Sequence, residues 1–289
     1  MDIYSETEEQ KNPTWDVRLT GKLVTAVFGA AQWKKVHASV RSMTDRPEFC
    51  HYHYHEALDM MNEYIDSKLK ETGLWGVYED YDEFSHLMLK IRANITAFVQ
   101  SLHAVADTCS HMLYYALALD RLPRPLKERD IYANKVLKLL EQQRDEGSPN
   151  YDNLCKLFRG ITTGDDYKYL NALTNTSKHR SIVRPELNED ATGRREEKWI
   201  LFLESFWYAK EFFEKINARE FMQKEHDRIQ HLTVQIGVEL NDVLKKLQSF
   251  KPTTPAIEKI GEESISQQPY DHHDCLTEVS SKPSLKKKY

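Results

Sequence analysis

Three consecutive titratable or cationic side chains, Lys178, His179 and Arg180, end a polar segment near the middle of the chain. A histidine can accept or release a proton near neutral pH, and neighbouring lysine and arginine side chains can bind a phosphate. Asn171 and Asn175 stand four residues apart in the same segment, so on a helix they share a face. Alternatively, the cations only complement the dipole of a helix C-terminus. The segment predicts either a phosphate-handling site or an ordinary helix end.

A second polar group lies on an otherwise apolar segment that also contains Arg92. His103, Asp107 and His111 follow one another there at four-residue steps. On a helix such a ladder shares one face, where a carboxylate can orient an imidazole as a base or the histidines can bind a metal. The alternative is a buried polar seam in which each group is hydrogen bonded, as buried polar groups normally are.

Histidines and tyrosines alternate at residues 51–55. On a strand all three histidines would face one way, whereas on a helix His51, His55 and Asp59 would line up at four-residue steps. Either pattern can bind a transition metal. A cluster of histidines is only compositional evidence, however, and no further ligands with a recognised spacing follow it. We therefore predict the start of an aromatic and polar helix, with no metal and no cofactor.

The common sequence motifs of nucleotide, hydride and serine-hydrolase chemistry do not occur in the chain. It contains no P-loop, no dinucleotide-binding glycine pattern, no HExxH and no GxSxG. The net charge of −5 argues against a protein that coats nucleic acid through general basicity. A local basic patch is still possible, because phosphate binding depends on where the charges lie.

The four cysteines, Cys50, Cys109, Cys155 and Cys275, lie far apart, so the sequence has no zinc-ribbon spacing. Free thiols are typical of a reducing compartment. The first residues are acidic and lack an apolar stretch, which argues against a signal peptide. No apolar run is long enough to span a bilayer. We therefore expect a cytoplasmic protein that does not associate with membranes.

Composition favours long helices. Of the 289 residues, 40% are hydrophobic and 29% are charged, which allows a packed core, and only 10 are glycine and 10 proline. Apolar residues recur at three- and four-residue steps through 81–120, where no glycine or proline interrupts them, so this segment predicts one long core helix. Further helices are predicted at about 15–40, 54–70, 128–144, 150–158, 165–180 and 217–247. The second of these follows a break at residues 45–47, where Pro47 stands.

Two extended runs around a glycine-bearing polar loop predict a small β-hairpin at residues 181–208. The second run is rich in aromatic and β-branched residues, and periodicity alone leaves a helix over 199–215 as an alternative. The predicted fold is mainly α, a multi-helix bundle with long core helices and this hairpin. The sequence also predicts a flexible N-terminus at residues 1–13, one helical domain at 14–250 and a disordered tail at 251–289.

Two of these segments, residues 92–107 and 171–180, resemble HEPN-like proteins, a helical superfamily of prokaryotic defence, toxin and RNA-processing systems. The resemblance covers about half of the chain. It implies a long helix that meets a shorter helix ending in Lys-His-Arg, an RNA-binding protein or metal-independent ribonuclease of a defence or stress system, and a homodimer. In such an enzyme His179 would be the general base, Lys178 and Arg180 would bind the phosphate, and Asn175 would position it.

Active HEPN ribonucleases carry an arginine and a histidine on a helix with four to six residues between them. The corresponding pairs here are Arg46 with His51 or His53, and Arg219 with His226. Arg46 precedes Pro47, whereas Arg219 and His226 share a face of a predicted helix about two turns apart. None of these pairs coincides with residues 178–180, so a non-catalytic protein remains an alternative. A non-enzymatic helical protein that binds another protein is the second functional hypothesis.

Overall fold

The computed structural model describes residues 14–143, 150–190, 192 and 198–250. The flexible N-terminus predicted at residues 1–13 and the disordered tail predicted at residues 251–289 lie outside the described residues. All helices and strands described below belong to one compact unit of the chain, Met1–Lys251.

The first two helices, α1 (Val17–Phe28) and α2 (Ala30–Tyr64), meet at Gly29. Gly29 has a φ of 92°, a conformation that glycine adopts without the strain other residues would incur. The break predicted at residues 45–47 is wrong, because α2 continues through Pro47. A proline inside a helix removes one backbone hydrogen bond. Met43 and Cys50 on either side are fully buried, and this packing keeps the helix continuous.

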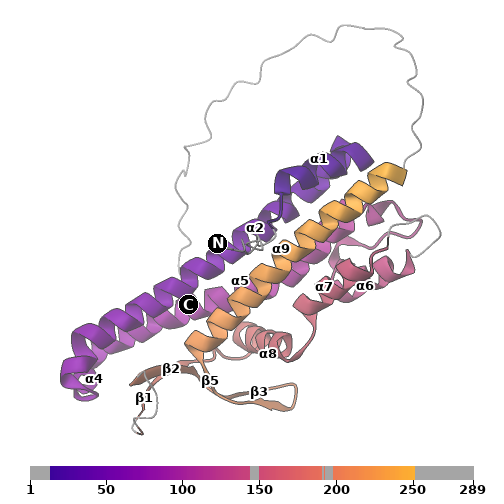
Figure 1. Cartoon of the computed structure of the whole chain (residues 1–289). Coiled ribbons are helices and arrows are strands. Elements are labelled where there is room, and N and C mark those ends of the chain that lie inside the picture. Colours follow the sequence, from indigo (N-terminus) through magenta and orange to yellow (C-terminus); the bar gives the residue numbers. More distant parts are fainter. Residues whose placement is uncertain (1–13, 144–149, 191, 193–197, 251–289) are drawn as a thin grey trace, which may run out of the picture. The chain divides into compact units, whose positions relative to one another are not determined.

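After α2 the chain reverses direction through several short turns. These are a π-helical turn, η1 (Ile65–Leu69), and two short helices, α3 (Lys70–Thr72) and α4 (Trp75–Glu79). The long helix α5 (Tyr81–Ala116) then runs back along α2, and the two lie side by side in Figure 1. The side chain of Asp80 accepts a hydrogen bond from the Glu83 amide and so caps α5. The long core helix predicted over 81–120 is confirmed.

The middle of the chain forms shorter elements. They are η2 (Leu119–Arg121), η3 (Glu128–Asp130), α6 (Ala133–Gln142), α7 (Asp152–Thr162) and α8 (Asp165–His179). The helices predicted at about 150–158 and 165–180 are confirmed, whereas the one predicted at about 128–144 is a short 3-10 turn followed by a helix that begins at Ala133. The helix α8 packs against α5, and α7 packs against both α6 and the last helix.

Five strands follow α8 among the residues that the structure describes. They are β1 (Pro185–Glu189), β2 (Trp199–Leu203), β3 (Phe206–Tyr208), β4 (Glu211–Phe213) and β5 (Ile216–Asn217). The strand β2 pairs antiparallel with β1 on one side and with β5 on the other, and β3 pairs antiparallel with β4. The predicted β-hairpin is thus confirmed. The alternative of a helix over 199–215 is wrong, because this stretch pairs as strands.

The last helix, α9 (Ala218–Phe250), begins after Asn217. The Asn217 carboxamide oxygen accepts hydrogen bonds from the amides of Arg219 and Glu220, which confirms the predicted N-cap. Figure 1 shows α9 running along α1 and α2. No helix among the described residues is both long enough and apolar enough to cross a membrane.

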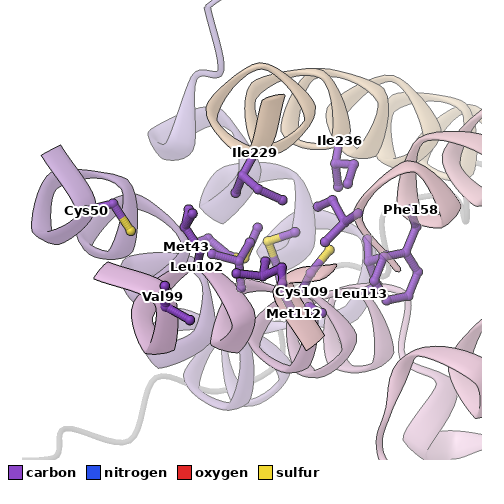
Figure 2. Close-up of a cluster of buried hydrophobic side chains, with 14 of the residues drawn as sticks. Met43, Cys50, Val99, Leu102, Cys109, Met112, Leu113, Phe158, Ile229 and Ile236 are labelled. Atoms are coloured by element: carbon purple, nitrogen blue, oxygen red, sulfur yellow. The ribbon is translucent and has the colours of Figure 1, made fainter. Parts of the chain in front are cut away.

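One hydrophobic core joins these helices. Figure 2 shows its centre, where side chains from α2, α5, α7 and α9 meet. The labelled members are Met43, Cys50, Val99, Leu102, Cys109, Met112, Leu113, Phe158, Ile229 and Ile236. The protein is therefore mainly α-helical with a small antiparallel β part, as composition and periodicity predicted. This core fixes α5, α8 and α9, the three helices that carry most of the candidate site residues.

Candidate functional site

The cationic run predicted as a site lies where α8 ends. Lys178, His179 and Arg180 are all exposed, and Arg180 is the residue that ends the helix. Residues on the preceding turns, among them Leu173 and Thr174, are buried against the bundle. The three cationic or titratable side chains therefore project into solvent from a helix end that the core holds in place.

The β3–β4 hairpin lies next to this helix end. The guanidinium of Arg180 sits over the Tyr208 ring, 5.5 Å from its centroid, and its Nη1 donates a hydrogen bond of 3.5 Å to the Trp207 carbonyl. Trp207 and Phe212 form an exposed aromatic pair with ring centroids 5.2 Å apart. Cations and aromatic rings therefore share one surface. We call residues 178–180 together with β3 and β4 the α8–hairpin surface.

An aromatic cluster fixes the hairpin to α8. The ring of Tyr169 on α8 contacts the rings of Phe206, Phe213 and Phe221, and Phe206 stacks on Phe213. Burial raises the pKa of Tyr169, so its hydroxyl stays protonated at all physiological pH values. Because this packing orients β3, the Trp207 side chain on the opposite face of the strand points outward.

A polar seam connects α8 with α5. His103 Nε2 lies 3.0 Å from Asn171 Oδ1, and Asn175 Nδ2 donates to the same oxygen at 2.9 Å. Since Asn171 Oδ1 is only an acceptor, His103 must carry its proton on Nε2. The His103 ring also stacks on Tyr167. Burial and the nearby Asp107 carboxylate raise the pKa of Tyr167, so this phenol also stays neutral.

The structure thus brings together three of the predicted residues, His103, Asn171 and Asn175. His103 bonds to Asn171 and does not pair with Asp107, which is exposed. Arg92 is half-buried on α5, about three turns before His103. Within the part of the chain that the structure describes, no hydrogen bond links Lys178, His179 or Arg180 to the seam. The seam and the cationic helix end are two separate features of α8.

Three further candidate histidines, His51, His55 and His226, meet elsewhere, between α2 and α9. The ring centroids of His51 and His55 are 4.3 Å apart, and those of His51 and His226 are 5.8 Å apart. They line a polar cavity of about 360 Å³ together with Tyr54 and Asp227, and we call it the histidine pocket. The sequence had placed these histidines in two unrelated candidate groups.

The arginine and histidine side chains of the pairs considered for a HEPN-like site bind to different helices. Arg219 donates from Nη2 to Asn62 Oδ1 at 2.9 Å, so its side chain reaches toward α2. Arg46 donates from Nε to Thr108 Oγ1 at 3.1 Å, and His53 Nδ1 lies 2.8 Å from Asn94 Oδ1, so both face α5. Arg46 lies inside the continuous helix α2, although Pro47 had predicted a break in the helix there.

Two sets of residues were considered as possible metal ligands: His51, His55 and Asp59 and, separately, His103, Asp107 and His111. No group of three or more His, Cys, Asp or Glu side chains among the described residues is arranged to hold a metal ion. The helical spacing of each ladder is real, since α2 and α5 are continuous through both. Spacing along one helix did not produce a group of three donors arranged for a metal in the described part of the chain.

Sequence reasoning missed the aromatic half of the α8–hairpin surface. Trp207 and Phe212 were seen only as members of an aromatic-rich run that could be strand or helix. Once β3 and β4 are known to pair, the alternation of buried Phe206 with exposed Trp207 places the tryptophan on the outer face.

Comparisons of the chain with protein-family models, with curated proteins and with solved structures gave no match. The functional argument therefore depends on the geometry of the site.

Proposed function

We propose that the protein binds single-stranded RNA at the α8–hairpin surface. The observation that carries the proposal is the contact of Arg180 with Tyr208, which places the cationic helix end beside the exposed rings of Trp207 and Phe212. Proteins that bind single-stranded nucleic acid combine cations that contact the phosphates with aromatic rings on which bases stack.

The positive charge of this surface is available to a ligand. Lys178, Arg180 and Lys210 take part in no salt bridge among the residues that the structure describes, whereas Lys168 nearby is paired with Glu211. Lys210 lies in the turn between β3 and β4 with a positive φ of 69°. Unpaired cations attract phosphates, and their binding releases counterions, so the affinity should fall steeply with salt.

The finer proposal is metal-independent cleavage of the bound RNA. His179 would take the proton of a 2′-hydroxyl, and Lys178 and Arg180 would stabilise the negative charge that develops on the phosphorus centre. Asn175 is engaged with Asn171, so it would support the helix end instead of contacting the phosphate. From the resemblance of residues 92–107 and 171–180 alone, we further propose that the protein is a HEPN-like cytoplasmic homodimer of a prokaryotic defence or stress system.

Binding is tested by fluorescence anisotropy with a labelled single-stranded 12-nucleotide RNA. Trp207→Ala and Arg180→Ala should each weaken binding by about tenfold, since stacking on one aromatic ring contributes about 1–3 kcal/mol. Lys138→Ala is the matched control, because it removes one exposed cation from α6. Equal affinities for all four proteins would contradict the proposal.

Cleavage is tested separately on the same RNA in the presence of a metal chelator. His179→Ala should abolish the appearance of shorter products and leave RNA binding within about threefold of the parent protein, because His179 is exposed and supports no core contact. If His179→Ala still cleaves, the catalytic part of the proposal fails. If the parent protein binds RNA but never cleaves it, the chain is an RNA-binding protein.

A second candidate function, a non-enzymatic protein that binds another protein, rests on a different surface. Trp75, Tyr78 and Tyr81 are each about two thirds or more exposed at and beside α4 (68%, 75% and 65%). Grouped exposed aromatic side chains are typical of protein-binding surfaces. A Trp75→Ser, Tyr78→Ser double variant that loses a partner while it keeps RNA affinity would favour this function.

A further inference from the structure

The histidine pocket between α2 and α9 is separate from the α8–hairpin surface, because none of its lining residues belongs to that surface. Its volume of about 360 Å³ falls within the range of small-molecule pockets, which is about 300–1,000 Å³. Apart from Pro47, every residue that lines it carries a side chain able to form hydrogen bonds. The pocket therefore suits a small polar ligand.

Aromatic rings form one wall of the pocket. The ring centroid of His51 lies 4.3 Å from that of His55 on the same helix and 5.8 Å from that of His226 on α9. The ring of Tyr54 contacts that of His55, with centroids 5.0 Å apart. The unpaired bases of nucleic acids stack on rings of these kinds. The wall favours a planar ring as the ligand.

A hydroxyl and a carboxylate meet beside this wall. Burial raises the pKa of Tyr54, Arg219 opposes the shift, and the Asp227 carboxylate is close enough to add to it. The Tyr54 hydroxyl therefore keeps its proton, and it forms no hydrogen bond within the described part of the chain. It can donate to a ligand, whereas the Asp227 carboxylate can only accept. The pocket thus offers a donor close to an acceptor.

Asp227 is held in place by its neighbours on α9. Gln223 Nε2 donates a hydrogen bond of 2.8 Å to Asp227 Oδ2, and His226 Nδ1 lies 3.4 Å from Asp227 Oδ1. A carboxylate can accept about four hydrogen bonds, so positions remain for a ligand. The Asp227 side chain is 60% exposed, which leaves it accessible.

The charge of the lining argues against a phosphate group inside the pocket. Glu48 and Asp227 both line it, and no lysine or arginine does so among the described residues. Glu48 forms no salt bridge in that part of the chain. Phosphates are normally bound by arginine and lysine side chains, and a negative field repels them. The ligand inside the pocket should therefore be an uncharged ring.

We propose that the histidine pocket binds a guanine base. Guanine carries an acceptor oxygen, O6, beside N–H donors at N1 and N2. The Asp227 carboxylate would accept hydrogen bonds from N1 and N2, the Tyr54 hydroxyl would donate to O6, and the ring would stack on the imidazoles. Adenine carries a donor in place of O6 and has no amino group at position 2, so it matches the pocket less well. A free guanine nucleoside and a guanine of a bound RNA share this chemistry.

The proposal is tested by isothermal titration calorimetry of the full chain with guanosine. Inosine is the matched control, because it lacks only the amino group at position 2. Guanosine should bind saturably, and inosine about tenfold more weakly, since it loses a hydrogen bond to a charged carboxylate. Adenosine should bind more weakly than inosine. The absence of guanosine binding, or equal affinities for guanosine and inosine, would overturn the proposal.

Variants locate the binding site. Asp227→Asn should weaken guanosine binding by about tenfold and Tyr54→Phe by about threefold, because a hydrogen bond to a charged group is the stronger one. Asp242→Asn removes an exposed carboxylate elsewhere on α9 and should change nothing. Guanosine binding that Asp227→Asn and Tyr54→Phe leave unchanged would mean that the nucleoside binds outside this pocket, and the proposal would fail. Trp207→Ala should not affect guanosine, so the titration stands even if RNA binding at the α8–hairpin surface is not found.

The two sources of the base are distinguished with RNA. Fluorescence anisotropy compares a single-stranded 12-nucleotide RNA that contains guanines with the same RNA in which inosine replaces each guanine. If the inosine RNA binds more weakly and Asp227→Asn removes the difference, the pocket takes a guanine of the RNA. If both RNAs bind equally while guanosine still binds, the ligand is the free nucleoside.

Discussion

His103 and Asn171 are joined by a contact of 3.0 Å across 68 positions of the sequence, and this contact ties α8 to the long helix α5. Asn171 Oδ1 also accepts the hydrogen bond of Asn175. One oxygen therefore satisfies two half-buried donors from two helices. The seam orients α8, and the position of α8 in turn fixes where Lys178, His179 and Arg180 project from the surface.

Replacing Asn171 with alanine should destabilise the fold, because His103 loses its acceptor and Asn175 keeps only its hydrogen bond to the backbone carbonyl of residue 171. Leaving buried donors unpaired costs about 1–3 kcal/mol in the free energy of unfolding, which urea denaturation measures. Asn153→Ala is the control, since it removes only an exposed bond to Glu239 and should cost less than about 0.5 kcal/mol. If both variants unfold at the same urea concentration, the seam contributes nothing to stability.

The helices of this fold were predictable where their apolar periodicity is strong. The segment 81–120 has an uninterrupted pattern and forms α5, and Asn217 begins α9 as an N-cap side chain should. Pro47 misled the prediction because the packing of its neighbours Met43 and Cys50 is not visible in local sequence. Local patterns describe the preference of a segment, and tertiary packing can override it.

The candidate site was predictable only in part, because its pieces come from distant segments. The polar residues of α5 and α8 were identified, and three of them, His103, Asn171 and Asn175, meet in the seam. The contact of His51 with His226 joins α2 to α9, and nothing local to either segment reveals it. The contact of Arg180 with Tyr208 likewise depends on how the β3–β4 hairpin packs on Tyr169.

The buried thiol of Cys50 makes the stability of the fold depend on pH in the alkaline range. Burial raises its pKa from about 9 to about 12, with Arg46 opposing the shift, because the thiolate is poorly solvated beside the Phe98 carbonyl. The neutral thiol favoured by the fold makes its full contribution to stability below about pH 9. That contribution falls as the pH rises from about 9 toward 12, where the unfolded chain ionises first.

Cys50→Ala should therefore flatten the loss of stability between pH 9 and 11, measured by urea denaturation at each pH, even though the variant starts less stable at pH 7. The native protein should also resist alkylation of Cys50 at pH 8 and react only after unfolding, as mass spectrometry of the labelled peptide would show. Rapid labelling of native Cys50 would contradict its burial.

Pro47 offers a test of how much strain α2 tolerates. Pro47→Ala restores a backbone donor and removes the ring from the helix interior, so the free energy of unfolding should rise by about 1–3 kcal/mol. Thermal and urea unfolding measure this change. Glu48→Ala at the next position keeps the proline and should alter stability by less than about 0.5 kcal/mol. A loss of stability in Pro47→Ala would mean that the proline ring itself contributes to the packing of α2.

Gly237 marks the place where α9 approaches the start of the described chain. A Cβ added there would overlap the Trp15 ring, whose indole nitrogen is held by a hydrogen bond of 2.8 Å to Thr20 Oγ1. Thr20 is bonded in turn to Asn241 of α9. The ring cannot move aside without breaking this chain of bonds. We expect Gly237→Ala to destabilise the protein although alanine is the better helix former.

Gly160→Ala separates the two effects, because Gly160 also lies in a helix but its added Cβ would meet only the flexible end of the Leu232 side chain. The propensity gain of about 1 kcal/mol should leave Gly160→Ala as stable as the parent or slightly more so. Gly237→Ala should lose about 1–3 kcal/mol by urea denaturation, together with a change in tryptophan fluorescence as Trp15 is displaced. An equal rise in the free energy of unfolding of both variants would show that Trp15 moves away from α9 at little cost. The position of α1 would then depend mainly on its contacts with α2.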